Sequence, residues 1–159
     1  MAAVDYFLKI DGIPGESQDK THKNEIQLDS FSWGATNSGS SAMGGGAGVG
    51  RVQMQDFHFV MGVNKASPKL MLACANGEHI KSAVLVCRKA GKEQQEFLKY
   101  TFSDLLISSF QTGGTEVLPA NQISFNYSKI EMEYKEQKPD GTLAGAVKSF
   151  YDLKQQSGG

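Results

Sequence analysis

The sequence predicts a mainly β fold, a curled β-barrel or sandwich of two sheets with bulged strands and one short α-helix. Alternation of apolar and polar residues, which is typical of half-buried strands, recurs in several segments. In four places two successive apolar residues are three positions apart instead of two, so the apolar residues move to the other face of the strand. A separate segment at 67–77 is bracketed by proline and glycine, as a short helix would be. All 159 residues are expected to form a single domain.

The first strand is predicted at residues 4–11. Val4, Tyr6, Leu8 and Ile10 alternate with polar or charged residues there, and a Gly-Ile-Pro-Gly sequence then breaks the pattern.

In the later strands, the four places at which successive apolar residues are three positions apart, which we call slips, can be located. One separates Leu28 from Phe31, and the others fall at 54–57, 102–105 and 127–130. A β-bulge adds one residue to a strand, changes the direction of the side chains beyond it and bends the strand. The four slips therefore predict bulged strands that turn corners, as strands do in barrels and orthogonal sandwiches.

One helix is predicted, with Ser67 as its N-cap, Pro68 at its first position and Gly77 at its end. The residues expected on its buried face are Leu70, Met71 and Cys74. The strand predicted at 80–87 is apolar on both faces, so the helix or a neighbouring subunit should cover one of them. The segment 143–153 has a weaker strand pattern, and the tail at 155–159 is expected to be loose.

A long uncharged segment at 36–50 lies between two strong strand patterns, and six of its fifteen residues are glycine. A hairpin needs only about two to five loop residues, and a longer structureless loop is uncommon unless it binds something or is disordered. The segment is interpreted as a flexible interaction arm, with a plain disordered loop as the alternative. Nucleotide binding is disfavoured, because no Gly-Lys-Ser/Thr follows and Arg51 begins a strand.

Charge and hydropathy disfavour nucleic acid and membrane insertion. The net charge is -1 with a pI near 6.3, which creates no general attraction for phosphate backbones or anionic lipids. No stretch approaches about 18 consecutive apolar residues, and the N-terminal residues lack the pattern of a cleaved signal peptide. Folding is therefore expected in the cytoplasm, and any export should proceed without a cleaved signal peptide.

No catalytic, cofactor-binding or metal-binding residues are predicted, so the chain is interpreted as a protein without enzymatic activity. Cys74 and Cys87 are too few for a disulfide framework and should be reduced. His22, His58 and His79 lack metal-binding spacing, and no Gly-x-Ser-x-Gly sequence suggests a serine hydrolase.

Seven segments, taken together, resemble the haemolysin-coregulated protein (Hcp) family, the tube protein of type VI secretion. They are YFLKIDGIPGES at 6–17, DKTHKNEIQLDSFSWG at 19–34, GVGRVQMQDFHF at 48–59, SPKLMLACANGEHI at 67–80, RKAGKEQQEFL at 88–98, LISS at 106–109 and NYSKIEMEY at 126–134. These segments cover nearly the whole chain in one order.

The resemblance implies a structural subunit that forms homohexameric rings with a wide channel. The implied partners are other copies of the chain, a contractile sheath around the stacked rings, a valine-glycine repeat spike protein at the tip and secreted effectors in the lumen. Contraction would expel the tube from a Gram-negative cell.

The resemblance also implies that the loop after the second strand projects towards a neighbouring ring or subunit. The residues expected at this contact are Thr36, Asn37, Ser38, Gly39, Ser40, Ser41, Ala42, Met43, Gly44, Gly45, Gly46, Ala47 and Gly48. Ser32 lies on the strand face opposite Phe31 and Trp33, and is expected to face the lumen and contact effectors.

Two other functions fit the residues alone. One is a monomeric β-sandwich that binds carbohydrate or peptide through the glycine-rich loop, and the other is a hydrolase whose site is assembled from distant residues. The oligomeric state distinguishes the tube subunit from both.

Overall fold

The structure is a computed structural model that describes residues 3–38, 51–91 and 93–159. The described elements are β1 (Val4–Ile10), β2 (Ile26–Leu28), β3 (Ser30–Ser32), β4 (Ala35–Asn37), β5 (Val52–Met54), β6 (Phe57–Gly62), α1 (Ser67–Asn76), β7 (His79–Lys89), β8 (Glu96–Gly113), β9 (Ala120–Gln137), β10 (Leu143–Asp152) and β11 (Ser157–Gly158). The prediction of a mainly β protein with one short helix is confirmed.

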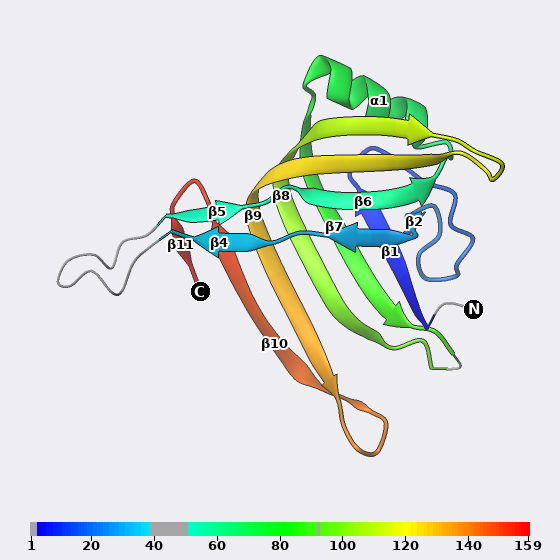
Figure 1. Cartoon of the computed structure of the whole chain (residues 1–159). Coiled ribbons are helices and arrows are strands. Elements are labelled where there is room, and N and C mark those ends of the chain that lie inside the picture. The colour runs from blue at the N-terminus through cyan, green and yellow to red at the C-terminus, as the bar shows by residue number, and fades with distance from the viewer. Residues whose placement is uncertain (1–2, 39–50, 92) are drawn as a thin grey trace.

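Nine strands form one antiparallel sheet that forks along β9 (Figure 1). One side of β9 pairs with β8 along most of its length. On its other side, residues 120–125 pair with β6 and residues 129–137 pair with β10. The upper branch therefore has the order β3-β6-β9-β8-β7-β1-β2, and the lower branch replaces β6 and β3 with β10 and β11.

The upper branch curls back on itself without closing into a complete barrel. The chain passes directly from β2 into β3, and the N–H of Asp29 between them donates to the carbonyl of Val60 in β6 at 2.8 Å. No ladder joins β2 to β6 among the described strands. The second sheet is only the two-stranded ribbon of β4 and β5, so a sandwich of two full sheets is not observed.

The four predicted slips have causes other than a simple bulge. Two are breaks between strands, at Asp29 and at residues 55–56. The other two face each other, because Phe102 pairs with Ile130 and Leu105 with Tyr127 in one unchanged register. The apolar side chains of both strands therefore move to the opposite face at the same level of the ladder, beside Asp104, whose φ is 54°. The register shift in this ladder lies between residues 107 and 109, where Ile107 and Phe110, both on the core side, are also three positions apart.

The core is a cluster of phenylalanines enclosed by the curled sheet. Phe57 from β6 is fully buried, with ring centroids 4.9 Å from Phe102 and 5.0 Å from Phe125. Helix α1 lies across one end of the sheet and contributes Leu70 and Ala73 to the core (Figure 1).

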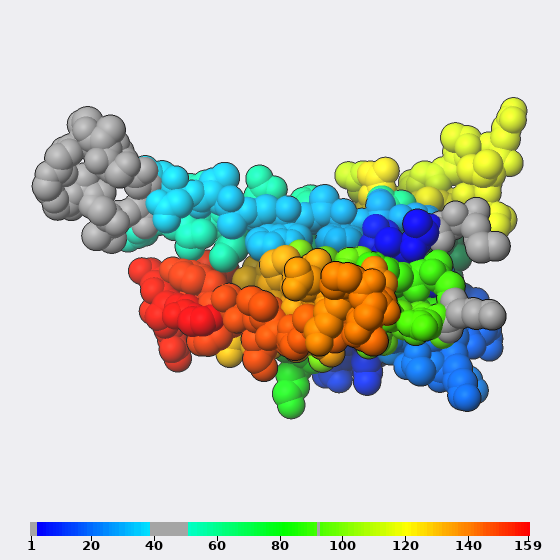
Figure 2. Space-filling view, turned by 90° about the horizontal axis from the view of Figure 1, so that it is seen from below, coloured from blue at the N-terminus to red at the C-terminus, as the bar shows by residue number. Residues whose placement is uncertain are grey.

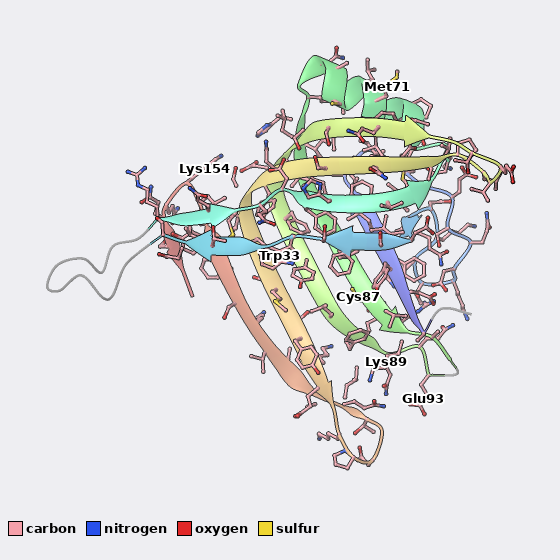
Figure 3. The ribbon with its side chains drawn as sticks, viewed as in Figure 1. Trp33, Met71, Cys87, Lys89, Glu93 and Lys154 are labelled. Carbon is pink, nitrogen blue, oxygen red and sulfur yellow. The ribbon has the colours of Figure 1, made fainter. Side chains whose placement is uncertain are left out.

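Two details of the helix prediction were wrong. The Ser67 side chain does not cap the helix, because its hydroxyl donates to Asn121 Oδ1 at 2.6 Å, and Ala66 is the N-cap. Met71 is 52% exposed on the outer side of α1 rather than buried (Figure 3). Gly77 ends the helix in the left-handed conformation, as predicted.

The second apolar face of β7 is covered by the loop at 14–25 of the same chain, and not by the helix. Phe7 of β1 stacks on His22 of this loop with a centroid distance of 4.5 Å, and Arg88 of β7 bonds to Asp19. On this face Val86 is buried, whereas Val84 is only partly covered.

The tail is paired, which differs from the expectation of a loose end at 155–159. Residues 157–158 form β11 against Tyr151 and Asp152, and Gly159 exchanges two backbone hydrogen bonds with Phe150. The Asp152 carboxylate accepts bonds from the N–H groups of Lys154 and Gln155, which stabilises the turn.

Candidate functional site

Ser32 lies in a row of polar residues that crosses four strands of the upper branch. Ser32 of β3 pairs with His58 of β6, His58 pairs with Ser124 of β9, and Ser124 pairs with Ser109 of β8. Because paired residues point to the same side of a sheet, this row faces away from the phenylalanine core.

A second row runs beside the first and completes a shallow hollow of about 310 Å³. Its members are Ser30, Val60, Gln122 and Gln111. We call the two rows the neutral face: Ser30, Ser32, His58, Val60, Ser109, Gln111, Gln122 and Ser124. None of these residues is Asp, Glu, Lys or Arg.

Hydrogen bonds fix the floor of the neutral face. The buried Ser124 hydroxyl bonds to Ser109 at 2.6 Å and to Ser108 at 2.8 Å, and Ser108 donates to Asp56. Burial, with a smaller contribution from Asp56, raises the pKa of Tyr127 to about 12, so its hydroxyl stays a donor to the carbonyl of Gln55. Within the described part of the chain, the side chains of Ser30, Ser32, His58, Gln111 and Gln122 bond to no other residue.

Beyond the bend beside Asp104, the outward face of β9 carries charged residues. The outward residues of β9 are Gln122, Ser124 and Asn126 in the upper branch, and Lys129, Glu131, Glu133 and Lys135 in the lower branch. Exposed sheet faces commonly carry such charges, which keep them soluble and prevent unwanted pairing. The uncharged stretch therefore ends where the sheet bends and forks.

The predicted arm is described only at its base. Thr36 and Asn37 belong to the exposed β4–β5 ribbon, where they pair with Gln53 and Val52, and the N–H of Ser38 donates to the carbonyl of Arg51. Figure 2 shows this ribbon extending to one side of the molecule. The other expected contact residues, Gly39 to Gly48, lie outside the described residues, so their contact stays a prediction.

Sequence patterns placed Ser32 on the strand face opposite Phe31 and Trp33, but they did not place the residues beside it. His58 and Gln122 could be placed on the face opposite Phe59 and Ile123, yet their adjacency to Ser32 depends on strand pairing. Gln111 lies beyond the register shift in β8, so counting along the strand would not place it in this row.

Among the described residues, the histidines, cysteines and carboxylates elsewhere form no metal centre. No group of three or more His, Cys, Asp or Glu residues suited to a metal ion occurs in the described segments. Cys74 and Cys87 are not bonded to each other, and burial raises the pKa of the Cys87 thiol to about 12, which disfavours the reactive thiolate. No described helix is long and apolar enough to span a membrane.

Comparison with known proteins establishes the family. The family model described as "Type VI secretion system effector, Hcp" matches residues 7–134, which is most of the chain. The chain belongs to the Hcp family. Protein hcp1 of Pseudomonas aeruginosa is 43% identical over 157 residues, covering 96% of this chain and 97% of that protein.

Solved Hcp structures share the fold over almost the full length. Hcp1 from Salmonella typhimurium has a TM-score of 0.84 at 36% identity and covers 99% of each chain. A structure described as a type six secretion system protein has a TM-score of 0.90 at 27% identity, covering 99% of this chain and 100% of that one. This Hcp-family chain is a secreted tube subunit and effector carrier of type VI secretion, and not an enzyme.

Proposed function

We propose that six copies of this chain close into a ring whose neutral face lines the channel, and that these rings stack into the secretion tube. The observation that carries the proposal is the uncharged, concave face around Ser32. A channel lined by neutral hydrogen-bonding groups accepts cargo of either charge, because it creates no field that repels one sign. In this arrangement Ser32 and its row contact secreted effectors.

An uncovered apolar surface in the lower branch supports contact between copies. Figure 1 shows β8, β9 and β10 extending past the crossing strands β3 and β6. Along this extension, Met132 and Tyr134 of β9 continue the core side of the strand but are 40% and 45% exposed, and Val147, paired with Tyr134, is 72% exposed. Such a patch, with an aromatic residue at its centre, is typical of a protein interface.

The remaining partners follow from tube assembly. We propose that rings assemble in the cytoplasm inside a contractile sheath, that a valine-glycine repeat spike protein forms the tip, and that secretion uses no cleaved signal peptide. The glycine-rich arm at 36–48 would contact the adjacent ring.

Size-exclusion chromatography with light scattering tests the ring directly. We expect a particle of six subunits of 17.2 kDa each at micromolar concentration and ordinary salt. A dominant monomer would refute the ring and favour a monomeric binding domain.

Replacing Ser32 with glutamine should leave the ring intact and weaken effector retention. The longer side chain fills part of the hollow but adds no charge, so folding and assembly should be unaffected. The measurement is co-purification of effectors with the ring. The control is Ser103→Gln on the outward side of β8, where Ser103 pairs with Lys129. Equal retention of every effector by both variants would remove Ser32 from the cargo site.

Replacing residues 39–48 with a short Ser-Gly turn should preserve folding and ring size but prevent stacking and secretion. The closure entropy of a loop changes slowly with length, so little stability should be lost. Several weak arm contacts per ring can hold a stack by avidity, and all of them would be removed together. Thermal melting, light scattering and in-cell secretion are measured on the same variant. Normal secretion would show that the arm is a passive connector.

A further inference from the structure

Two acidic side chains of the loop between β1 and β2, Asp19 and Glu25, bond to groups of the same subunit, whereas Asp11 and Glu16 are exposed. Both carboxylate oxygens of Asp19 accept bonds from the Arg88 guanidinium at 2.9 Å, and this pairing lowers the pKa of Asp19 well below its usual range. Glu25 bonds to the ring of buried His22 at 3.0 Å, and Glu96 bonds to the other nitrogen of that ring. These acidic groups are therefore engaged within the subunit.

Backbone hydrogen bonds hold the loop in one conformation. The N–H of Gly15 donates to Asn24 at 2.7 Å, and the N–H groups of Ser17 and Asn24 donate to Glu25 and Ser17. The chain segments approach so closely that a Cβ on Gly15 would lie 2.5 Å from the carbonyl oxygen of Glu25. The loop is thus a preformed surface, and these N–H groups are unavailable to a ligand.

The lysines of this region point outward. Lys9, Lys20 and Lys23 are exposed and line one hollow of about 490 Å³, and none of them forms an ion pair within the described residues. Glu25, which contacts His22, is the acidic residue in the lining. The apolar part of the lining comes from Ile10, Ile13 and Pro14.

We propose that this hollow binds a short acidic segment of a partner protein, with Lys9, Lys20 and Lys23 contacting its carboxylates. The lining of this hollow carries three lysines and one glutamate, although the whole chain has a net charge of -1. Phosphate sites commonly use clustered backbone N–H groups, and those of Gly15, Ser17 and Asn24 are already bonded within this loop. A carboxylate-rich peptide needs only the ammonium groups, and the apolar lining suits its side chains.

This inference goes beyond the proposed function and does not depend on ring formation. The loop lies over the β1–β7 side of the molecule, and the neutral face lies on β3, β6, β8 and β9 (Figure 1). In the space-filling view the loop forms a blue projection at the lower right, separate from the β4–β5 ribbon (Figure 2).

The test is binding of a fluorescein-labelled peptide of alternating Glu and Ala to the full chain, followed by fluorescence anisotropy. The site variant carries Lys9→Gln, Lys20→Gln and Lys23→Gln. The control carries Lys99→Gln, Lys135→Gln and Lys148→Gln, which remove the same charge from β8, β9 and β10. We expect the Kd to rise about tenfold for the site variant, since each exposed ion pair contributes modestly, and to stay unchanged for the control.

Further arms identify the ligand and check the fold. The corresponding triple Lys→Arg variant should retain binding, because it keeps the charge, and thermal melting should match wild type for all variants. Equal weakening by the site and control variants would show non-specific attraction. Displacement of the peptide by inorganic phosphate at equal charge concentration would show a general anion site. Loss of ring assembly in the site variant would identify a second copy as the occupant. Any of these three results would overturn the proposal.

Discussion

A Tyr134→Asp chain should be a folded monomer at concentrations where the unmodified chain forms rings. Tyr134 is 45% exposed at the centre of the uncovered patch on β9, between Leu98 of β8 and Val147 of β10. Tyrosines in such central positions often contribute about 2 kcal/mol or more to association. A carboxylate at this position would in addition lose its hydration in the interface. Light scattering measures the mass, and circular dichroism verifies the fold.

The matched control is Ser103→Asp, which places the same charge on the opposite side of the same sheet beside Lys129. This variant should retain the ring. If Tyr134→Asp also remains a ring, the uncovered patch is not the contact between subunits, and the ring forms through another surface.

Replacing Arg88 with methionine should destabilise the subunit by about 3 kcal/mol, because it leaves the partly buried carboxylates of Asp19 and Asp5 without their cation. Arg88 is 3% exposed, bonds to Asp19 and Asp5, and lies 4.8 Å above the ring of Phe7. Its carboxylate partners would then lie against an apolar side chain. Urea unfolding of the Tyr134→Asp monomer measures this loss without a contribution from assembly.

The pH dependence of Asp19→Asn tests the same ion pair. The pKa of Asp19 is lowered in the folded chain, mainly by its bonds to Arg88. Its contribution to stability is therefore fully present above the unfolded pKa of about 3.9 and is lost as the pH falls towards the folded pKa. The difference in unfolding free energy between wild type and Asp19→Asn should be large at pH 7 and shrink below about pH 4. A difference that is constant with pH would show that the ion pair does not stabilise the fold.

The sequence predicted which segments form strands and a helix better than it predicted which segments lie beside one another. The alternating pattern of a strand depends on local geometry, as do the proline and glycine that begin and end the helix at Pro68 and Gly77. The strands and the helix could therefore be located from the sequence alone. Met132 and Tyr134 continue the apolar alternation of Ile130, and that pattern cannot distinguish a residue in the subunit core from one left for another molecule. The sequence did not predict that the loop at 14–25 covers β7, because this contact depends on the ion pair between Arg88 and Asp19, which lie far apart in the sequence. For the same reason, the sequence placed Ser32 on the face away from the core but did not predict the row of residues that pairs with it.

The bend beside Asp104 has a geometric consequence for assembly. Asp104 has a left-handed backbone conformation, which aspartate tolerates better than a β-branched residue does, and its carboxylate lies 3.2 Å from Lys154 Nζ. The bend sets the angle between the neutral upper branch and the lower branch that carries the apolar patch. In a closed ring, the orientation of each subunit relative to the next must add up to a full circle. The angle of the bend beside Asp104 would thus help to determine the diameter of the channel.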